Sequence, residues 1–187
     1  VATLTVSGPE GEQPANPAEM LAAGDRFWPL RAFRELDDAL LRLRIVEPLI
    51  GTVVVKTRGD QAAMLAMDDL LIAHQNQWLV REIIHFMKRT LKRMDLTSRS
   101  FFAFIEPGSC FAGSLFELAL ASDRSYMLDD PDQDNTIALS KMNGSVLLMS
   151  NGLTRLETRF LHDPERVKDL LARGGTFDPQ EALEAGL

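Results

Sequence analysis

The chain has 187 residues, 45% of them hydrophobic, and a formal net charge of −7, which predicts one acidic domain with a single sizeable core. The absence of a basic run argues against a nucleic-acid partner, and no apolar stretch approaches the roughly 18 residues that a membrane span needs. A single cysteine, Cys110, excludes an internal disulfide and gives no metal-ligand spacing. No signal peptide is visible, so we expect a cytoplasmic domain.

The first half of the chain predicts two strands separated by helices. Residues 2–8 alternate and are β-branched, which is typical of a strand, and residues 9–24 have the composition of a loop. Apolar residues recur at helical spacing from Leu30 to Arg44. A buried strand is expected at 51–57, followed by a mostly helical stretch from Gln61 to Met94 with a break near 73–77.

The second half predicts a further strand and several short elements. The strand occupies 98–105, and an acidic loop follows at 128–135. The remaining predictions are a short strand at Thr136–Leu139, an irregular segment at 143–151 and helices at 115–121, 153–160, 164–172 and from Asp178 onward. Strands that alternate with helices predict an α/β domain with parallel strands.

One stretch, Phe101 to Asp123, carries the strongest indication of chemistry. A buried strand leads into a turn with the sequence EPGSC, and a small-residue step at Ala112, Gly113 and Ser114 opens an apolar helix. Such a turn gathers unpaired backbone N–H groups, which can bind a carboxylate, a phosphate or a developing oxyanion. Glu117 follows Gly113 by about one turn, and an acid beside an oxyanion hole suggests proton transfer next to a carbonyl.

The sequence ELALASD at 117–123 resembles the corresponding helix of the crotonase, or enoyl-CoA hydratase, superfamily. The turn before it departs from the usual glycine-rich form and is about one residue longer. That departure, together with RGD at 58–60, MSNGLTRLETRF at 149–160 and FDPQEALEAGL at 177–187, resembles a ring-cleaving branch of the superfamily. The resemblance implies a crotonase-like ββα spiral over residues 1–187, read as a piece of a longer polypeptide without its C-terminal helices.

The resemblance also implies where a thioester would bind. Two backbone N–H groups would hold the thioester oxygen, one from Gly113 or, because the turn is longer, from Ser114. The other would come from the loop at 58–64, where Ala63 is the best match and Ala62 and Met64 are alternatives. If the resemblance carried no function, Gly113 would simply allow close packing of strand and helix.

Glu117 matches the first catalytic glutamate of the superfamily, but the second is absent. Its place falls at Ser140 or Lys141, which puts ordinary hydration in doubt. Glu106, in the turn, could supply another acid or could merely pair with Arg58 or Arg99.

Three further residues complete the candidate site. Cys110 could be a thiolate stabilised by the helix N-terminus, or could be ordinary core packing. Asn143 and Asn151 lie in the segment that lines the acyl pocket in the superfamily, and could bind hydroxyl groups of a polar acyl group.

The resemblance implies an acyl-CoA substrate, with CoA as part of the substrate and not a cofactor. In the ring-cleaving branch, that substrate is an oxygenated benzoyl thioester. It also implies a homo-oligomer, a trimer or hexamer. Two alternatives remain: a hydratase or isomerase acting on linear acyl-CoA, and a catalytically silent crotonase-like assembly domain.

Overall fold

The computed structural model describes all of residues 1–187 and is a mixed α/β structure. It contains a four-stranded parallel sheet in the order β1-β2-β3-β4 and a two-stranded antiparallel pair, β5-β6. The strands are β1 (Ala2–Ser7), β2 (Thr52–Arg58), β3 (Ser100–Ile105), β4 (Arg124–Met127), β5 (Ile137–Ala138) and β6 (Thr176–Phe177).

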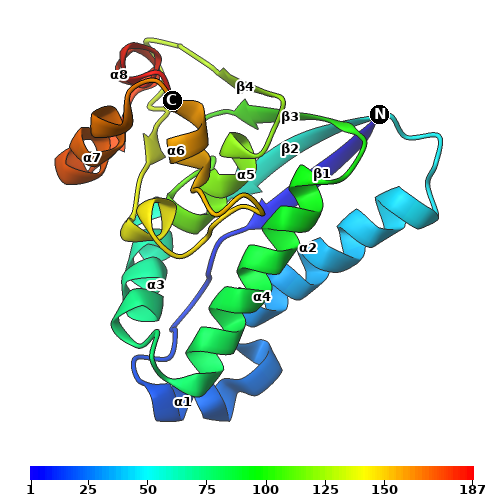
Figure 1. The fold of residues 1–187 in the computed structure, drawn as a ribbon, viewed down its shortest axis with the longest axis vertical. Helices are drawn as coiled ribbons and strands as arrows, with labels where there is room; N and C mark the ends of the chain where they lie inside the picture. Colours follow the sequence, from blue (N-terminus) through cyan, green and yellow to red (C-terminus); the bar gives the residue numbers. More distant parts are fainter.

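Helices separate the successive strands, and the long ones lie on one face of the four-stranded sheet, whereas the last two helices lie apart from it (Figure 1). They are α1 (Pro17–Ala23), α2 (Trp28–Ile45), α3 (Gln61–Ala73), α4 (Trp78–Asp95), α5 (Phe116–Leu120), α6 (Arg155–Arg159), α7 (Pro164–Arg173) and α8 (Pro179–Ala185). Three short 3₁₀ helices are η1 (Gly24–Arg26), η2 (Gly113–Leu115) and η3 (Lys141–Gly144). None of the helices is both long and apolar enough to cross a membrane.

The core lies between the sheet and the long helices α2 and α4, which run side by side (Figure 1). Alternate residues of the central strands point into it, among them Val53, Val55 and Ala103. Helix α2 contributes its apolar stripe from Phe33 to Leu43, because side chains three and four apart lie on one helix face. The buried apolar side chains form one contiguous cluster, as expected for one domain.

Most predicted elements are confirmed, including the parallel strands and the helix break between α3 and α4. The loop prediction for 9–24 was wrong at its end, because Asn16 caps helix α1 and Pro17 begins it. Strands β4 and β6 were missed, since four mostly exposed residues and two residues give no readable alternation. The helix predicted at 115–121 starts earlier, as the 3₁₀ turn η2, and continues as α5.

Candidate functional site

The turn predicted to carry the chemistry follows β3. The Ser109 hydroxyl accepts a hydrogen bond from the Glu106 N–H at 2.8 Å, and the Ser109 N–H donates to the Glu106 carbonyl at 2.9 Å. Gly108 adopts a φ of 80°, which permits the tight turn. The chain then passes through Cys110 into η2, where Gly113 has a φ of 50°. The turn therefore delivers Gly113, Ser114 and Glu117 into the core together.

Glu117 lies in a buried ion pair. Its side chain is 1% exposed, its Oε2 accepts from Arg155 Nη1 at 2.8 Å, and its Oε1 accepts from Asn143 Nδ2 at 2.8 Å. Arg155 also makes a two-pronged contact with the Asp95 carboxylate, at 3.1 and 2.7 Å. Burial raises the pKa of Glu117 above its ordinary value, although the charge of Arg155 acts in the opposite direction.

Asn143 fixes this arrangement with both of its amide hydrogens and its amide oxygen. Besides Glu117, its amide nitrogen donates to the Gly113 carbonyl at 2.9 Å, and its amide oxygen accepts from the Ser140 N–H at 2.8 Å. The structure thus brings Asn143, Glu117 and Gly113 together, as the resemblance implied.

A second buried acid, Asp68 of α3, lies against the same turn. Its Oδ2 accepts from the Ser114 N–H at 2.7 Å and from the Ser140 hydroxyl at 2.6 Å, whereas its Oδ1 has no partner. Burial raises its pKa from 3.8 to about 7, against the lowering effect of the hydrogen bonds from Ser140 and Ser114, and the charge of Glu117 adds to the rise. Asp68 is therefore an acid that exchanges its proton close to neutral pH.

Asp68 was not predicted from the sequence, although its position on a helix stripe could have indicated it. Met64, Met67 and Leu71 of α3 are buried, and Asp68 falls on the same stripe at helical spacing. A carboxylate on an apolar helix stripe needs a polar partner in the core. Searching for such a partner would have pointed to the N–H groups of the Gly113 turn.

Close contact with Asp68 also explains why residue 113 is glycine. A Cβ atom on Gly113 would lie 2.0 Å from Asp68 Oδ2, and the φ of 50° disfavours any other residue. Gly113 therefore has the close-packing role considered as its alternative, whatever else its N–H does.

Two of the predicted N–H donors, those of Ser114 and Ala63, face carboxylates in this structure. The Ser114 N–H donates to Asp68, and its hydroxyl is buried without a partner. The Ala63 N–H lies 3.5 Å from Oδ1 of Asp60, which caps the N-terminus of α3 and also accepts from the Ala62 N–H at 2.7 Å. Gly59 joins the end of β2 at Arg58 to the N-cap of α3 at Asp60.

Glu106 and Asn151 lie apart from this buried cluster. Glu106 is half exposed and pairs with Lys56 at 2.8 Å, not with Arg58 or Arg99, because Lys56 lies beside it on the neighbouring strand. Asn151 is exposed, and its side chain accepts from the Leu153 N–H within a turn.

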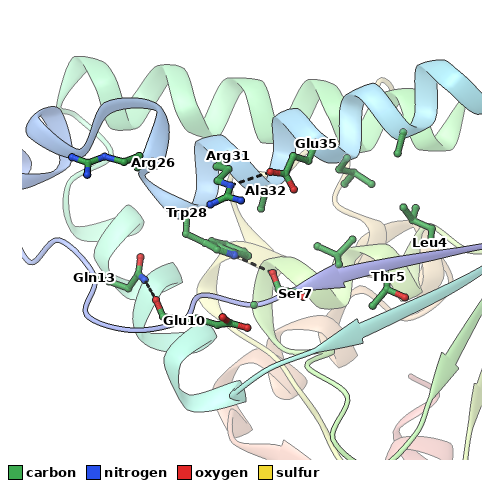
Figure 2. Close-up of a pocket in the computed structure, with 14 residues that line it drawn as sticks. Leu4, Thr5, Ser7, Glu10, Gln13, Arg26, Trp28, Arg31, Ala32 and Glu35 are labelled. Carbon is green, nitrogen blue, oxygen red and sulfur yellow. Dashed lines mark hydrogen bonds and ion pairs between the residues drawn. The ribbon is translucent and has the colours of Figure 1, made fainter.

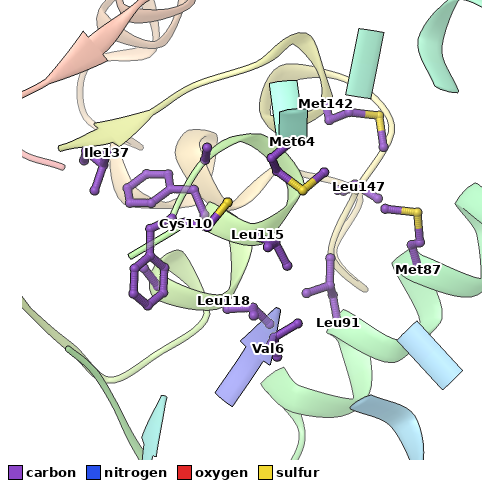
Figure 3. Packing of buried hydrophobic residues seen from close by; sticks show 14 of the residues in the cluster. Val6, Met64, Met87, Leu91, Cys110, Leu115, Leu118, Ile137, Met142 and Leu147 are labelled. Carbon is purple, nitrogen blue, oxygen red and sulfur yellow. The ribbon is translucent and has the colours of Figure 1, made fainter. Parts of the chain in front are cut away.

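Cys110 is enclosed by the core, with Leu115 and Met64 nearby (Figure 3). The pKa of its thiol is raised to about 12, chiefly by burial and also by the charges of Asp60 and Asp68. The thiolate considered for Cys110 is therefore not favoured at neutral pH, and core packing accounts for this residue.

Two clefts in the structure leave out Gly113 and Glu117. One, of about 520 Å³, runs between β1 and the start of α2, where the Trp28 indole donates to the Ser7 carbonyl and Arg31 pairs with Glu35 (Figure 2). The other, of about 410 Å³, lies between the end of α3, η3 and α7. No three or more His, Cys, Asp or Glu side chains lie together as a metal would require.

Comparison with solved structures defines the class of fold. Solved enoyl-CoA hydratases superpose on the chain: that from Bacillus anthracis has a TM-score of 0.58 and 21% identity, covering 84% of this chain and 57% of its own. The hydratase from Geobacillus kaustophilus has a TM-score of 0.59 and 20% identity, covering 98% of this chain and 62% of its own. The chain therefore has the crotonase fold, and the predicted fold class is confirmed.

Sequence similarity gives a more specific relationship than the fold does. The chain is 45% identical over 186 residues to a benzoyl-CoA-dihydrodiol lyase of Aromatoleum evansii, and this relative confirms the resemblance that the motifs at 58–60, 149–160 and 177–187 carry. That match covers 99% of this chain and 34% of the relative, so the chain spans about a third of the relative's length. No family model matches the chain.

Proposed function

We propose that this chain is a crotonase-fold segment of a lyase acting on the CoA thioester of an oxygenated benzoate. The substrate would be the 2,3-dihydrodiol or 2,3-epoxide of benzoyl-CoA. Hydrolytic ring cleavage would release formate and an aliphatic semialdehyde CoA thioester. The observation that carries the proposal is the 45% identity over nearly the whole chain to a benzoyl-CoA-dihydrodiol lyase.

The test of this proposal is an assay of the full-length protein with two substrates. We expect formate release from 2,3-epoxybenzoyl-CoA and hydration of crotonyl-CoA that is slower by roughly 100-fold or more, because sites built for polar groups discriminate strongly against substrates that lack them. Efficient crotonyl-CoA hydration without formate release would instead support a hydratase acting on linear acyl-CoA.

Within that lyase, two roles for this segment are supported by different observations. In the first, Glu117 is the acid–base residue, and the Ser114 or Gly113 N–H polarises the thioester carbonyl together with Ala63. A buried carboxyl with a raised pKa beside a helix start supports this role. Both Glu117 oxygens and the Ser114 N–H would then have to exchange their present partners for substrate.

In the second role, the segment is a silent crotonase-like domain used for assembly. One observation favours it: Glu117 is held by Arg155 and Asn143, and Asp68 occupies the Ser114 N–H. The homo-oligomer implied by the resemblance fits this role and stays a prediction, which light scattering of the full-length protein would check.

A matched pair of variants separates the two roles. Glu117→Gln and Asp95→Asn each take one carboxylate from Arg155, so both should destabilise the protein, by about 3–5 kcal/mol in the fully buried case of Glu117. If Glu117 transfers protons, only Glu117→Gln lowers kcat of the folded enzyme, by roughly 100-fold. Equal kcat in both variants would assign Glu117 to structure and this segment to assembly.

A further inference from the structure

The four-stranded sheet has one covered face and one uncovered face. Side chains alternate between the faces of a strand, and the covered face carries Val53, Val55, Phe101 and Ala103, all essentially buried. The side chains that alternate with these residues point the other way, and none of them, on any of the four strands, is buried.

The centre of the uncovered face is aromatic and apolar. The ring of Tyr126 makes edge contacts with Phe102 and Phe104, with centroids 6.2 and 5.6 Å apart. Val54 lies directly opposite Phe102 in the register of β2 and β3. Tyr126 is 54% exposed. We call this group, Val54, Phe102, Phe104 and Tyr126, the aromatic face.

An all-parallel sheet with one bare face is an unusual object. Parallel sheets occur almost only with both faces covered, and their strands are correspondingly apolar. A contiguous apolar patch on a surface marks an interaction site. The charged groups beside the aromatic face are compensated only in part. Lys56 and Glu106 pair with each other, whereas Arg124, opposite Phe102 in the register, is exposed and has no ion pair. The aromatic face therefore fits an apolar layer of protein that has room for acidic groups at its edge.

We propose that the aromatic face is the docking surface for a layer supplied by the part of the lyase polypeptide that lies outside residues 1–187. The proposal rests on the proposed function, since it takes this chain as a segment of a protein like its relative. The lengths of the two proteins support it. The match covers 99% of this chain but only 34% of the relative, so about two thirds of a polypeptide like the relative lies outside the matched region. A layer from that remainder would complete the sheet as parallel sheets require.

The test is photo-crosslinking in the full-length protein. Replacing Phe104 or Tyr126 with p-benzoylphenylalanine keeps an aromatic ring at each position, so the variants should fold. The matched control is the same replacement at Leu183, an exposed apolar residue of α8 that lies on no sheet face. After irradiation, the cross-linked peptides are identified by mass spectrometry.

We expect positions 104 and 126 to cross-link to peptides from outside residues 1–187, and position 183 not to do so. Cross-links from the aromatic face into residues 1–187 of a second copy would overturn the proposal, because they would make this face a contact between two copies of the segment. Yields no higher than at position 183 would also overturn it. Formate release is assayed on the same preparations without irradiation, so loss of the proposed activity is seen separately from loss of the cross-link.

Discussion

Asp68 allows the sharpest test of the buried site, through the pH dependence of stability. Its pKa is about 7 in the folded chain against 3.8 for an ordinary aspartate, a rise of about 3 units. One unit is worth 1.36 kcal/mol, so the buried carboxylate lowers stability by up to about 4 kcal/mol once it is ionised. Because the folded pKa is the higher one, this penalty is absent below about pH 4. It grows as the pH rises towards 7 and then stays constant.

The substitution Asp68→Asn removes the titration and keeps an oxygen that can accept from Ser114 and Ser140. The difference in unfolding free energy between the variant and the unsubstituted protein should therefore shift in favour of asparagine by about 4 kcal/mol between pH 4 and pH 8. Urea unfolding of the full-length protein across that range measures it. Asp69→Asn is the control, because Asp69 is exposed on the same helix. Parallel curves for Asp68→Asn and the unsubstituted protein would refute the argument that burial controls the protonation of Asp68.

Three further predictions concern the turn and its surroundings. Gly113→Ala should destabilise the protein by about 2–5 kcal/mol in urea unfolding, because it combines a clash with the buried Asp68 carboxylate and an unfavourable φ. The control is Gly152→Ala, which has a φ of 86° but open space around it and should lower stability by only about 1 kcal/mol. Cys110 should resist iodoacetamide in the native protein and react after unfolding, as followed by mass spectrometry, and rapid native alkylation would contradict its burial. Glu106→Gln should change stability by less than about 1 kcal/mol, since its pairing with Lys56 is partly exposed, and a larger loss would mean that the pair does more than the contact indicates.

The elements that could be predicted are those with local signals. Helical periodicity predicted α2, and alternation of β-branched residues predicted β1. The composition of residues 61–94 predicted the helices α3 and α4, and the apolar run at 51–57 predicted β2. The convergence of Gly113, Glu117 and Asn143 was implied by the resemblance, which carries information from a whole fold. The contacts that were not predicted join residues far apart in the sequence. The pairing of Glu117 with Arg155, 38 residues later, and of Asp68 with Ser114, 46 residues later, depends on tertiary packing that no local pattern encodes.

The missing second glutamate illustrates how packing changes the chemical interpretation. At the place where the superfamily has that acid, this chain has Ser140 or Lys141, and the Ser140 hydroxyl donates to Asp68 at 2.6 Å. The buried cluster therefore still contains two acids, Glu117 and Asp68, but the second comes from α3. Its carboxylate accepts from the Ser114 N–H, which is the alternative to the Gly113 N–H as the donor that the resemblance implies for the thioester oxygen.

An oxyanion and this carboxylate cannot occupy that donor together. A substrate carbonyl could reach the Ser114 N–H only if Asp68 moved away, and its other hydrogen bond, to Ser140, opposes that movement. If the Ser114 N–H holds the thioester oxygen, catalysis in this segment requires a change in α3 when substrate binds, whereas an assembly role requires none. Amide hydrogen exchange of Ser114 in the full-length protein distinguishes them. Binding of a benzoyl-CoA analogue should change exchange at Ser114 and in α3 if this is the acyl site, and unchanged exchange under saturating analogue would place the reacting atoms outside this segment.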